Sequence, residues 1–156
     1  MEKQEKEFPN NFNVMREYKI YKNIGNIQNN LLKKLAGHKK KENFSKYSEW
    51  EKYFKYTYLA RFTNLYDFQC YLNKKKRNCE LILKIHDKVY IPIVLAEVSV
   101  FFAMANKEKN IGIWGFMFAL LLATIGITIK ILIEYSGRKD FYTKCISIIK
   151  EEERKT

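Results

Sequence analysis

Two long apolar stretches in the C-terminal half dominate the pattern of hydrophobic and polar positions. Residues 89–105 read VYIPIVLAEVSVFFAMA and residues 111–129 read IGIWGFMFALLLATIGITI, with Glu97 as the one carboxylate between them. Each stretch approaches the ~20 residues that an α-helix needs to cross the ~30 Å hydrocarbon core of a bilayer. The second is apolar on every side, which is unusual for a helix in a water-soluble core. The pattern therefore predicts transmembrane helices over residues 89–105 and 111–133.

A very short turn joins the two predicted spans. Residues 106–110 leave no room for a domain, so the helices must run antiparallel. Lys and Arg are more frequent beside the outer ends of the spans than in this turn, which places both termini in the cytoplasm. The N-terminal segment lacks the pattern of a signal peptide. We expect an all-α, multi-pass protein of the inner (cytoplasmic) membrane: a two-helix transmembrane hairpin, an extracytoplasmic turn, and a cytosolic helical region over residues 1–88.

The cytosolic region is predicted to hold two long helices. Isoleucine and leucine recur every three or four positions and predict the first helix over residues 12–36. A capping box that begins at Ser48 predicts a second helix over residues 48–88, continuing into the first span. A break near residues 73–78 or 86–88 fits the sequence equally well.

The segment after the second span, residues 134–156, is expected to form a short cytosolic C-terminal helix. Its apolar side chains share one face and should pack back on the cytosolic region. They are Phe141, Cys145, Ile148 and Ile149.

Aromatic residues crowd the start of the second predicted helix. Trp50, Phe54, Tyr58 and Phe62 lie on one stripe, which favours a seam that packs against the first helix or against another copy. The alternative is a platform that stacks nucleobases, because Lys and Arg are interleaved with the rings. No RNA- or DNA-binding motif accompanies the stripe, so nucleic acid is not the expected partner.

The overall charge changes this picture little. The chain has 29 Lys and Arg against 17 Asp and Glu, a formal net charge of +12, which suits an anionic membrane or a nucleic acid. It is also rich in Lys, Asn and Ile, a bias that an AT-rich genome produces by itself. The three cysteines form no CxxC pair and agree with a reducing compartment.

Residues that could carry enzyme chemistry are almost absent. His38 and His86 are the two histidines, and neither has the spacing of a catalytic triad or a metal site. No glycine-rich phosphate loop occurs. We expect a protein that is not an enzyme and that holds neither a metal nor a cofactor.

Glu97 is the most informative polar residue because it falls near the bilayer midplane. An ionisable side chain there costs about 2.5 to 3.5 kcal/mol on insertion scales. Counting equal depths from the turn brings Glu97 level with residues 120–124, so Thr124 is a candidate partner. Glu97 is then either a protonated acid bonded between helices or part of the lining of a water-filled pore.

Small residues form a stripe on each predicted span and indicate where helices could meet closely in lipid. Two helices cannot enclose a channel, so a pore would require a homo-oligomer. The predicted packing residues are Pro92, Ala96, Ser99 and Ala103 on the first span, and Gly115, Ala119, Ala123 and Gly126 on the second.

The layout resembles the SLATT family of two-transmembrane effectors. The local matches are Leu59-Ala60-Arg61-Phe62 and the stretch LLLATIGITIKILIEYSGRKDFYTKCISI. The resemblance implies a pore-forming or membrane-disrupting effector of bacterial antiphage defence, which arrests the infected cell by abortive infection. It implies a sensor protein or a signalling nucleotide as the trigger, and Arg61 as an anchor on the cytosolic helix. No catalytic residue carries over.

The favoured hypothesis is therefore an oligomeric pore in which a signal at the cytosolic stripe, including Arg61, opens a path past Glu97. A membrane-anchored adaptor that tethers a cytosolic partner is the alternative. A membrane-tethered nucleic-acid binder is a third reading, and it predicts an affinity that falls steeply with salt.

Overall fold

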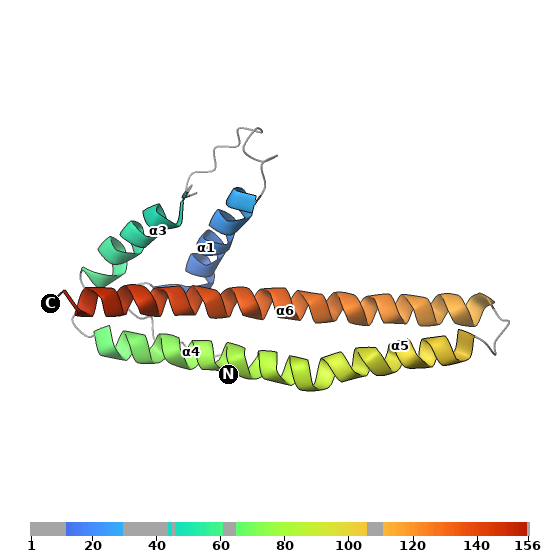
Figure 1. The fold of residues 1–156 in the computed structure, drawn as a ribbon. Coiled ribbons are helices and arrows are strands. Elements are labelled where there is room, and N and C mark those ends of the chain that lie inside the picture. Colours follow the sequence, from blue (N-terminus) through green and yellow to red (C-terminus); the bar gives the residue numbers. More distant parts are fainter. Residues whose placement is uncertain (1–11, 30–43, 45, 61–64, 106–110, 156) are drawn as a thin grey trace, which may run out of the picture. The chain divides into compact units, whose positions relative to one another are not determined.

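The computed structural model describes residues 12–29, 44, 46–60, 65–105 and 111–155 (Figure 1). Of these, 94% are helical and none lies in a strand, which confirms the all-α prediction. The helices are α1 (Val14–Asn29), α3 (Tyr47–Phe54), α4 (Leu65–Ile85), α5 (Ile91–Ala105) and α6 (Ile111–Glu153), with π-helical turns η1 (Lys55–Leu59) and η2 (His86–Tyr90).

The chain divides into two compact units. Met1–Lys75 and Asp140–Thr156 form one, which we call the aromatic unit, and Lys76–Lys139 form the other, the hairpin unit. Helices α4 and α6 each contribute residues to both.

The aromatic unit is held together by rings from segments far apart in the sequence. Phe12 meets Phe54, Tyr58 and Phe68 with ring centroids 6.0, 5.0 and 5.0 Å away. Phe54 stacks on Phe68 at 6.3 Å, although 14 residues of continuous helix would separate them by ~21 Å. The predicted unbroken helix over 48–88 is therefore wrong.

The chain folds back between α3 and α4. Helix α3 passes into η1, Ala60 forms a turn, and α4 begins at Leu65. Folding back buries rings that a single exposed helix would leave in water, and burying one large side chain contributes about 1.5 to 3 kcal/mol. The predicted end of the first helix, residues 30–36, lies outside the described residues.

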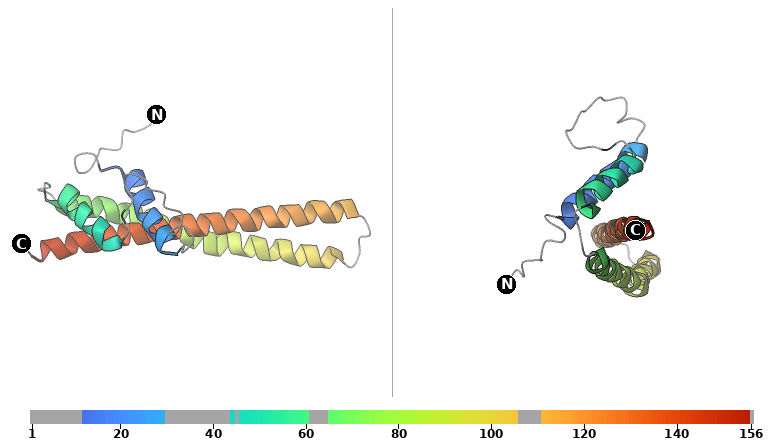
Figure 2. Two further views of the ribbon diagram at one scale, coloured as in Figure 1. Left: turned by 90° about the horizontal axis from the view of Figure 1, so that it is seen from above. Right: turned by 90° about the vertical axis from the view of Figure 1, so that its left-hand side faces the viewer.

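The C-terminal part of α6 belongs to the core of the aromatic unit. Within this unit α1 and α3 lie on one side of it and α4 on the other (Figures 1 and 2). Phe141 meets Trp50 and Tyr18, each at 5.9 Å between centroids. All four apolar residues predicted to pack back are buried: Phe141, Cys145, Ile148 and Ile149.

Ion pairs join the same part of α6 to η1. Lys55 Nζ lies 3.3 Å from Glu151 Oε1 and 3.1 Å from Glu152 Oε1. Burial by itself would lower the pKa of Lys55, but its hydrogen bonds with Glu152 and Glu151 raise that pKa above the ordinary value. The pKa values of both glutamates are lowered by hydrogen bonds with Lys155 and Lys55.

Helix α6 runs from Ile111 to Glu153 without interruption, so the predicted separate helix over 134–156 is wrong. The one helix-disfavouring residue near the expected boundary is Gly137, which costs only about 1 kcal/mol relative to alanine. Burial of the last turns outweighs that cost. Among the described residues, α6 is the one helix both long and apolar enough to cross a membrane.

In the hairpin unit, α5 and the first part of α6 lie side by side in two views (Figures 1 and 2). Near the turn, Phe101 meets Trp114 at 4.8 Å and Phe118 at 6.2 Å. The π-helical turn η2 holds about one residue more than an α-turn. Because of this additional residue, buried His86 and half-buried Val94 lie on the same side of the helix. The stripe of inward-facing residues on α4 therefore continues along α5.

Candidate functional site in the helical hairpin

A hydrogen bond between α5 and α6 forms the centre of the candidate site. Thr124 Oγ1 donates to Glu97 Oε2 at 2.6 Å, and both side chains are half-buried. Thr124 Oγ1 also lies 3.0 Å from the carbonyl oxygen of Leu121. The two side chains that the depth count paired are therefore in contact.

The same positions suit both protonation states of Glu97. A threonine hydroxyl has one hydrogen to donate and can also accept. A carboxylate at Glu97 accepts that hydrogen. A protonated Glu97 would instead donate to Thr124 Oγ1, and the Thr124 hydroxyl would turn to the Leu121 carbonyl.

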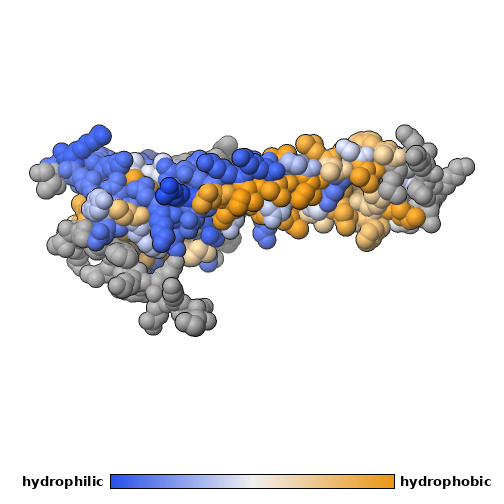
Figure 3. Space-filling model, turned by 90° about the horizontal axis from the view of Figure 1, so that it is seen from below, coloured by the Kyte–Doolittle hydropathy of each residue, from blue (hydrophilic) through white to orange (hydrophobic). Residues whose placement is uncertain are grey.

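Exposed apolar side chains surround this polar pair. In Figure 3 hydrophobic residues gather over α5 and the first part of α6, on the right of that view. Monomeric soluble proteins rarely expose an apolar patch larger than a few hundred Å². Exposed members include Leu95, Val100, Phe102, Ile113, Phe116, Phe118, Leu120, Leu122, Ile127 and Ile129.

The stripes of small residues do not form the contact between α5 and α6. All eight predicted packing residues are exposed: Pro92, Ala96, Ser99, Ala103, Gly115, Ala119, Ala123 and Gly126. A Cβ added at Gly115 or Gly126 would meet nothing within 4 Å. Larger residues such as Phe101 fill the seam. The stripes therefore lie on the outside of the hairpin, and the helices that they could meet are not among the described residues.

His86 is a second polar residue of the hairpin unit, and the sequence did not reveal its role. It is 1% exposed, with Nε2 3.1 Å from the Thr128 carbonyl oxygen and Nδ1 3.3 Å from Asp87 Oδ1. Its ring stacks on Tyr90 at 5.9 Å. A carbonyl oxygen only accepts, so Nε2 carries a hydrogen. The one available signal was that His86 continues the helical stripe of Cys79 and Leu83.

The predicted stalk residues lie inside the aromatic unit, as far as they are described. Trp50, Phe54 and Tyr58 are buried, and Trp50 meets Tyr21 of α1 at 5.1 Å. These residues pack against the first helix, as one of the two predicted kinds of seam required. Because their rings are buried, a nucleobase cannot stack on them. Arg61 and Phe62 lie outside the described residues.

A buried carboxyl group accompanies this seam. Glu17 is fully buried and accepts a hydrogen bond of 2.7 Å from Tyr58 Oη. Burial, then the bond with Glu17, raises the pKa of Tyr58 well above its ordinary value. Burial raises the pKa of Tyr21 to about 12 and also raises the pKa of the Cys145 thiol, where Glu17 adds to the effect. Tyr58, Tyr21 and Cys145 are therefore protonated at neutral pH.

No metal-binding cluster of three or more His, Cys, Asp or Glu occurs in the described part of the chain. No model of a known protein family, no curated protein and no solved structure matches this chain. The geometry of the hairpin unit is therefore the main structural indication of function.

Proposed function

We propose that this protein is a membrane-inserted hairpin whose copies assemble into a pore lined by Glu97. Two features support insertion: the length and hydropathy of α6, and the apolar side chains exposed around α5 and α6. The distribution of Lys and Arg supports a hairpin that crosses twice with both termini in the cytoplasm.

The observation that best supports a pore is the incomplete hydrogen bonding of Glu97 among the described residues. A carboxylate can accept about four hydrogen bonds, and among the described residues Thr124 is its one donor. A partly exposed carboxyl group in hydrocarbon is costly, so its remaining sites favour water or a neighbouring copy. Several hairpins around a water-filled path would supply both. The exposed small-residue stripes suit close approach between copies.

The resemblance to SLATT proteins supplies the biological setting of the proposal. In that setting the pore is an effector of bacterial antiphage defence that depolarises and arrests the infected cell. A sensor protein or a signalling nucleotide would act on the cytosolic part of the chain and open the pore.

The test is to induce the chain in a bacterial host and follow membrane potential, dye entry and growth. We expect depolarisation to precede growth arrest, and Glu97→Leu to reduce ion flux at least about tenfold, since a pore without a polar lining dewets. Glu97→Gln keeps a hydrogen-bond acceptor for Thr124 but removes the ionisable carboxyl group. It therefore distinguishes the effect of the charge on ion flux from the effect of the contact between the helices. Leu95→Val, a change at an exposed position of the same helix outside the small-residue stripe, is the matched control. Unchanged flux in Glu97→Leu would exclude the pore lining.

One observation favours an adaptor as the second candidate. The aromatic unit is a folded body with its own buried core, larger than a pore alone requires. Replacing residues 89–133 by an unrelated two-helix anchor distinguishes the two functions. An adaptor would keep its activity after the exchange, and a pore would lose it.

A further inference from the structure

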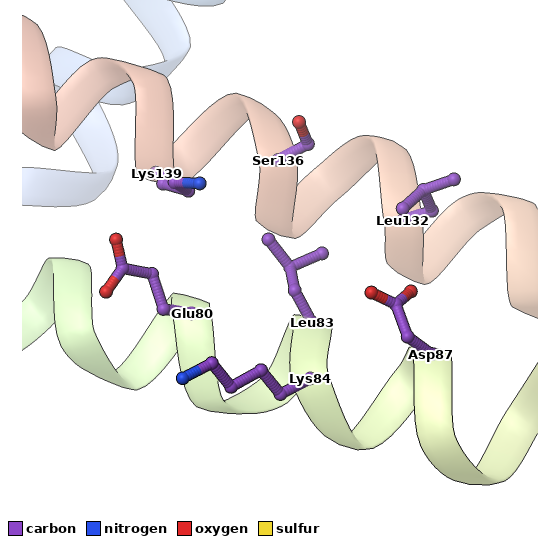
Figure 4. A pocket seen from close by; sticks show the side chains of 7 residues that line it. All are labelled: Glu80, Leu83, Lys84, Asp87, Leu132, Ser136 and Lys139. Carbon is purple, nitrogen blue, oxygen red and sulfur yellow. The ribbon is translucent and has the colours of Figure 1, made fainter.

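A groove in the hairpin unit carries charges of both signs. It has a volume of about 490 Å³ and lies between two stripes of side chains, one from α4 and η2 and one from α6. In Figure 4 Glu80 points toward α6 opposite Lys139, and Asp87 points toward Leu132. The lining residues are Glu80, Leu83, Lys84, Asp87, Leu132, Ser136 and Lys139.

The groove adjoins the apolar part of the hairpin. It covers residues 80–87 on one wall and 132–139 on the other, about 10 Å of helix rise each. A bilayer of ~30 Å hydrocarbon is ~40 to 45 Å thick with its headgroups, so each headgroup layer measures roughly 5 to 8 Å. If the apolar stretches lie in the hydrocarbon, the groove lies at headgroup depth.

The charges of the lining residues indicate which kinds of ligand the groove could bind. Its two lysines suit a phosphate, and its two carboxylates oppose a headgroup that is only anionic and suit an ammonium group. No aromatic side chain lines the groove to stack a nucleobase. Leu83 and Leu132 supply apolar surface for a glycerol backbone or the start of an acyl chain. A volume of this size is within the range of small-molecule sites.

We propose that this groove binds the headgroup of phosphatidylethanolamine, with the phosphate at Lys84 and Lys139 and the primary ammonium at one of the two carboxylates, Glu80 or Asp87. The proposal rests on the membrane insertion proposed above. Asp87 Oδ1 also lies 3.3 Å from His86 Nδ1, so this end of the groove adjoins the buried histidine. Phosphatidylcholine would bind less well because its quaternary ammonium has no N–H to donate.

The experiment uses the full chain reconstituted into vesicles of equal parts phosphatidylethanolamine, phosphatidylcholine and phosphatidylglycerol. The protein is extracted in mild detergent, and the co-purified lipids are measured by mass spectrometry. We expect phosphatidylethanolamine to be retained about fivefold over phosphatidylcholine, a modest factor because the charged groups are partly exposed. Lys84→Gln with Lys139→Gln removes the proposed phosphate contacts and should lower the retention of phosphatidylethanolamine and phosphatidylcholine alike.

Two further variants keep the proposal falsifiable. Lys88→Gln with Lys130→Gln removes two exposed lysines that do not line the groove and should preserve the preference. Glu80→Gln with Asp87→Asn should shift retention toward phosphatidylglycerol, a gain that misfolding cannot produce. Retention of phosphatidylglycerol by the unaltered chain, or equal retention of all three lipids, would overturn the proposal. Displacement of the lipid by millimolar phosphoethanolamine would assign the groove to the soluble compound.

Vesicle flotation at alkaline pH measures membrane insertion independently of lipid retention. A chain that does not float contradicts the proposed function, and the lipid site with it. A chain that floats without the headgroup preference contradicts the lipid site alone.

Discussion

In the aromatic unit Trp50, Phe54 and Phe68 are 0% exposed, whereas in the hairpin unit Phe102 is 65% and Phe116 70% exposed. The aromatic unit has a protein core of the usual kind, in which the buried rings are covered by rings from other segments of the chain. In the hairpin unit only Cys79 and His86 are buried among the described residues. The same kinds of side chain are thus buried in one unit and exposed in the other, among the described residues, and the exposed ones are those that the proposed membrane insertion would cover.

The largest effect should come from emptying the core of the aromatic unit. Trp50→Ala is expected to lower its free energy of unfolding by about 3 to 5 kcal/mol, because the indole is fully buried among rings. Hydrogen exchange of the full chain in detergent should show lost protection over 47–59. Tyr56→Ala, at a position 75% exposed, is the control. Equal effects of the two changes would contradict the description of this core.

A matched pair of arginine substitutions tests the difference in surroundings directly. Leu122 and Met15 are 53% and 49% exposed, but Leu122 lies in the hairpin unit and Met15 in the aromatic unit. In a membrane, Leu122→Arg should cost about 2.5 to 3.5 kcal/mol and reduce vesicle insertion, whereas Met15→Arg should have almost no effect. If Leu122→Arg inserts as well as the unaltered chain, the hairpin does not face lipid at this position.

The buried polar pair of the aromatic unit should have an intermediate effect. Tyr58→Phe removes the donor of the 2.7 Å bond to buried Glu17 and should destabilise the unit by about 1 to 3 kcal/mol. The measurement is again hydrogen exchange over α1 and α3. Tyr56→Phe removes a hydroxyl from an exposed ring and should change nothing measurable. A silent Tyr58→Phe would show that Glu17 does not depend on this bond.

The smallest effect concerns pH and the ion pairs on η1. The pKa values of Glu151 and Glu152 are lowered in the folded chain, so their contribution is present above the ordinary glutamate pKa of about 4.3. It is lost as the pH falls through the lower folded values. Protection from exchange over residues 51–59, measured relative to the intrinsic exchange rate at each pH, should therefore fall in acid, and Glu151→Gln with Glu152→Gln should remove this dependence. An unaltered dependence in that variant would assign it to other carboxyl groups.

The sequence predicted those features that follow from local spacing. Helix α5 spans nearly the predicted residues, and α6 begins at the predicted residue, because long apolar runs determine these limits. The depth count brought Glu97 to Thr124, since two antiparallel helices joined by a short turn have little freedom of register. The four apolar residues near the C-terminus are buried as the helical spacing indicated.

Features that depend on tertiary packing could not be predicted in this way. No glycine or proline marks the point after Leu59 where the chain folds back. The contacts of Phe68 with Phe54 and Phe12 favour this fold, rather than a turn motif. The burial of Glu17 depends on Tyr58, 41 residues away. The small-residue stripes lie on the outer face of each helix, and within one chain larger residues such as Phe101 and Trp114 form the contact.

The wide turn η2 also determines where the chain can change in length. A π-helical turn accommodates one additional residue while the helices on either side keep their faces. Removal of one residue there, such as exposed Lys88, would restore an ordinary α-turn and leave Glu97 directed at Thr124. The same deletion within α5 would rotate every following side chain by ~100° and separate the pair. Insertions and deletions at η2 are therefore the ones that this hairpin should tolerate.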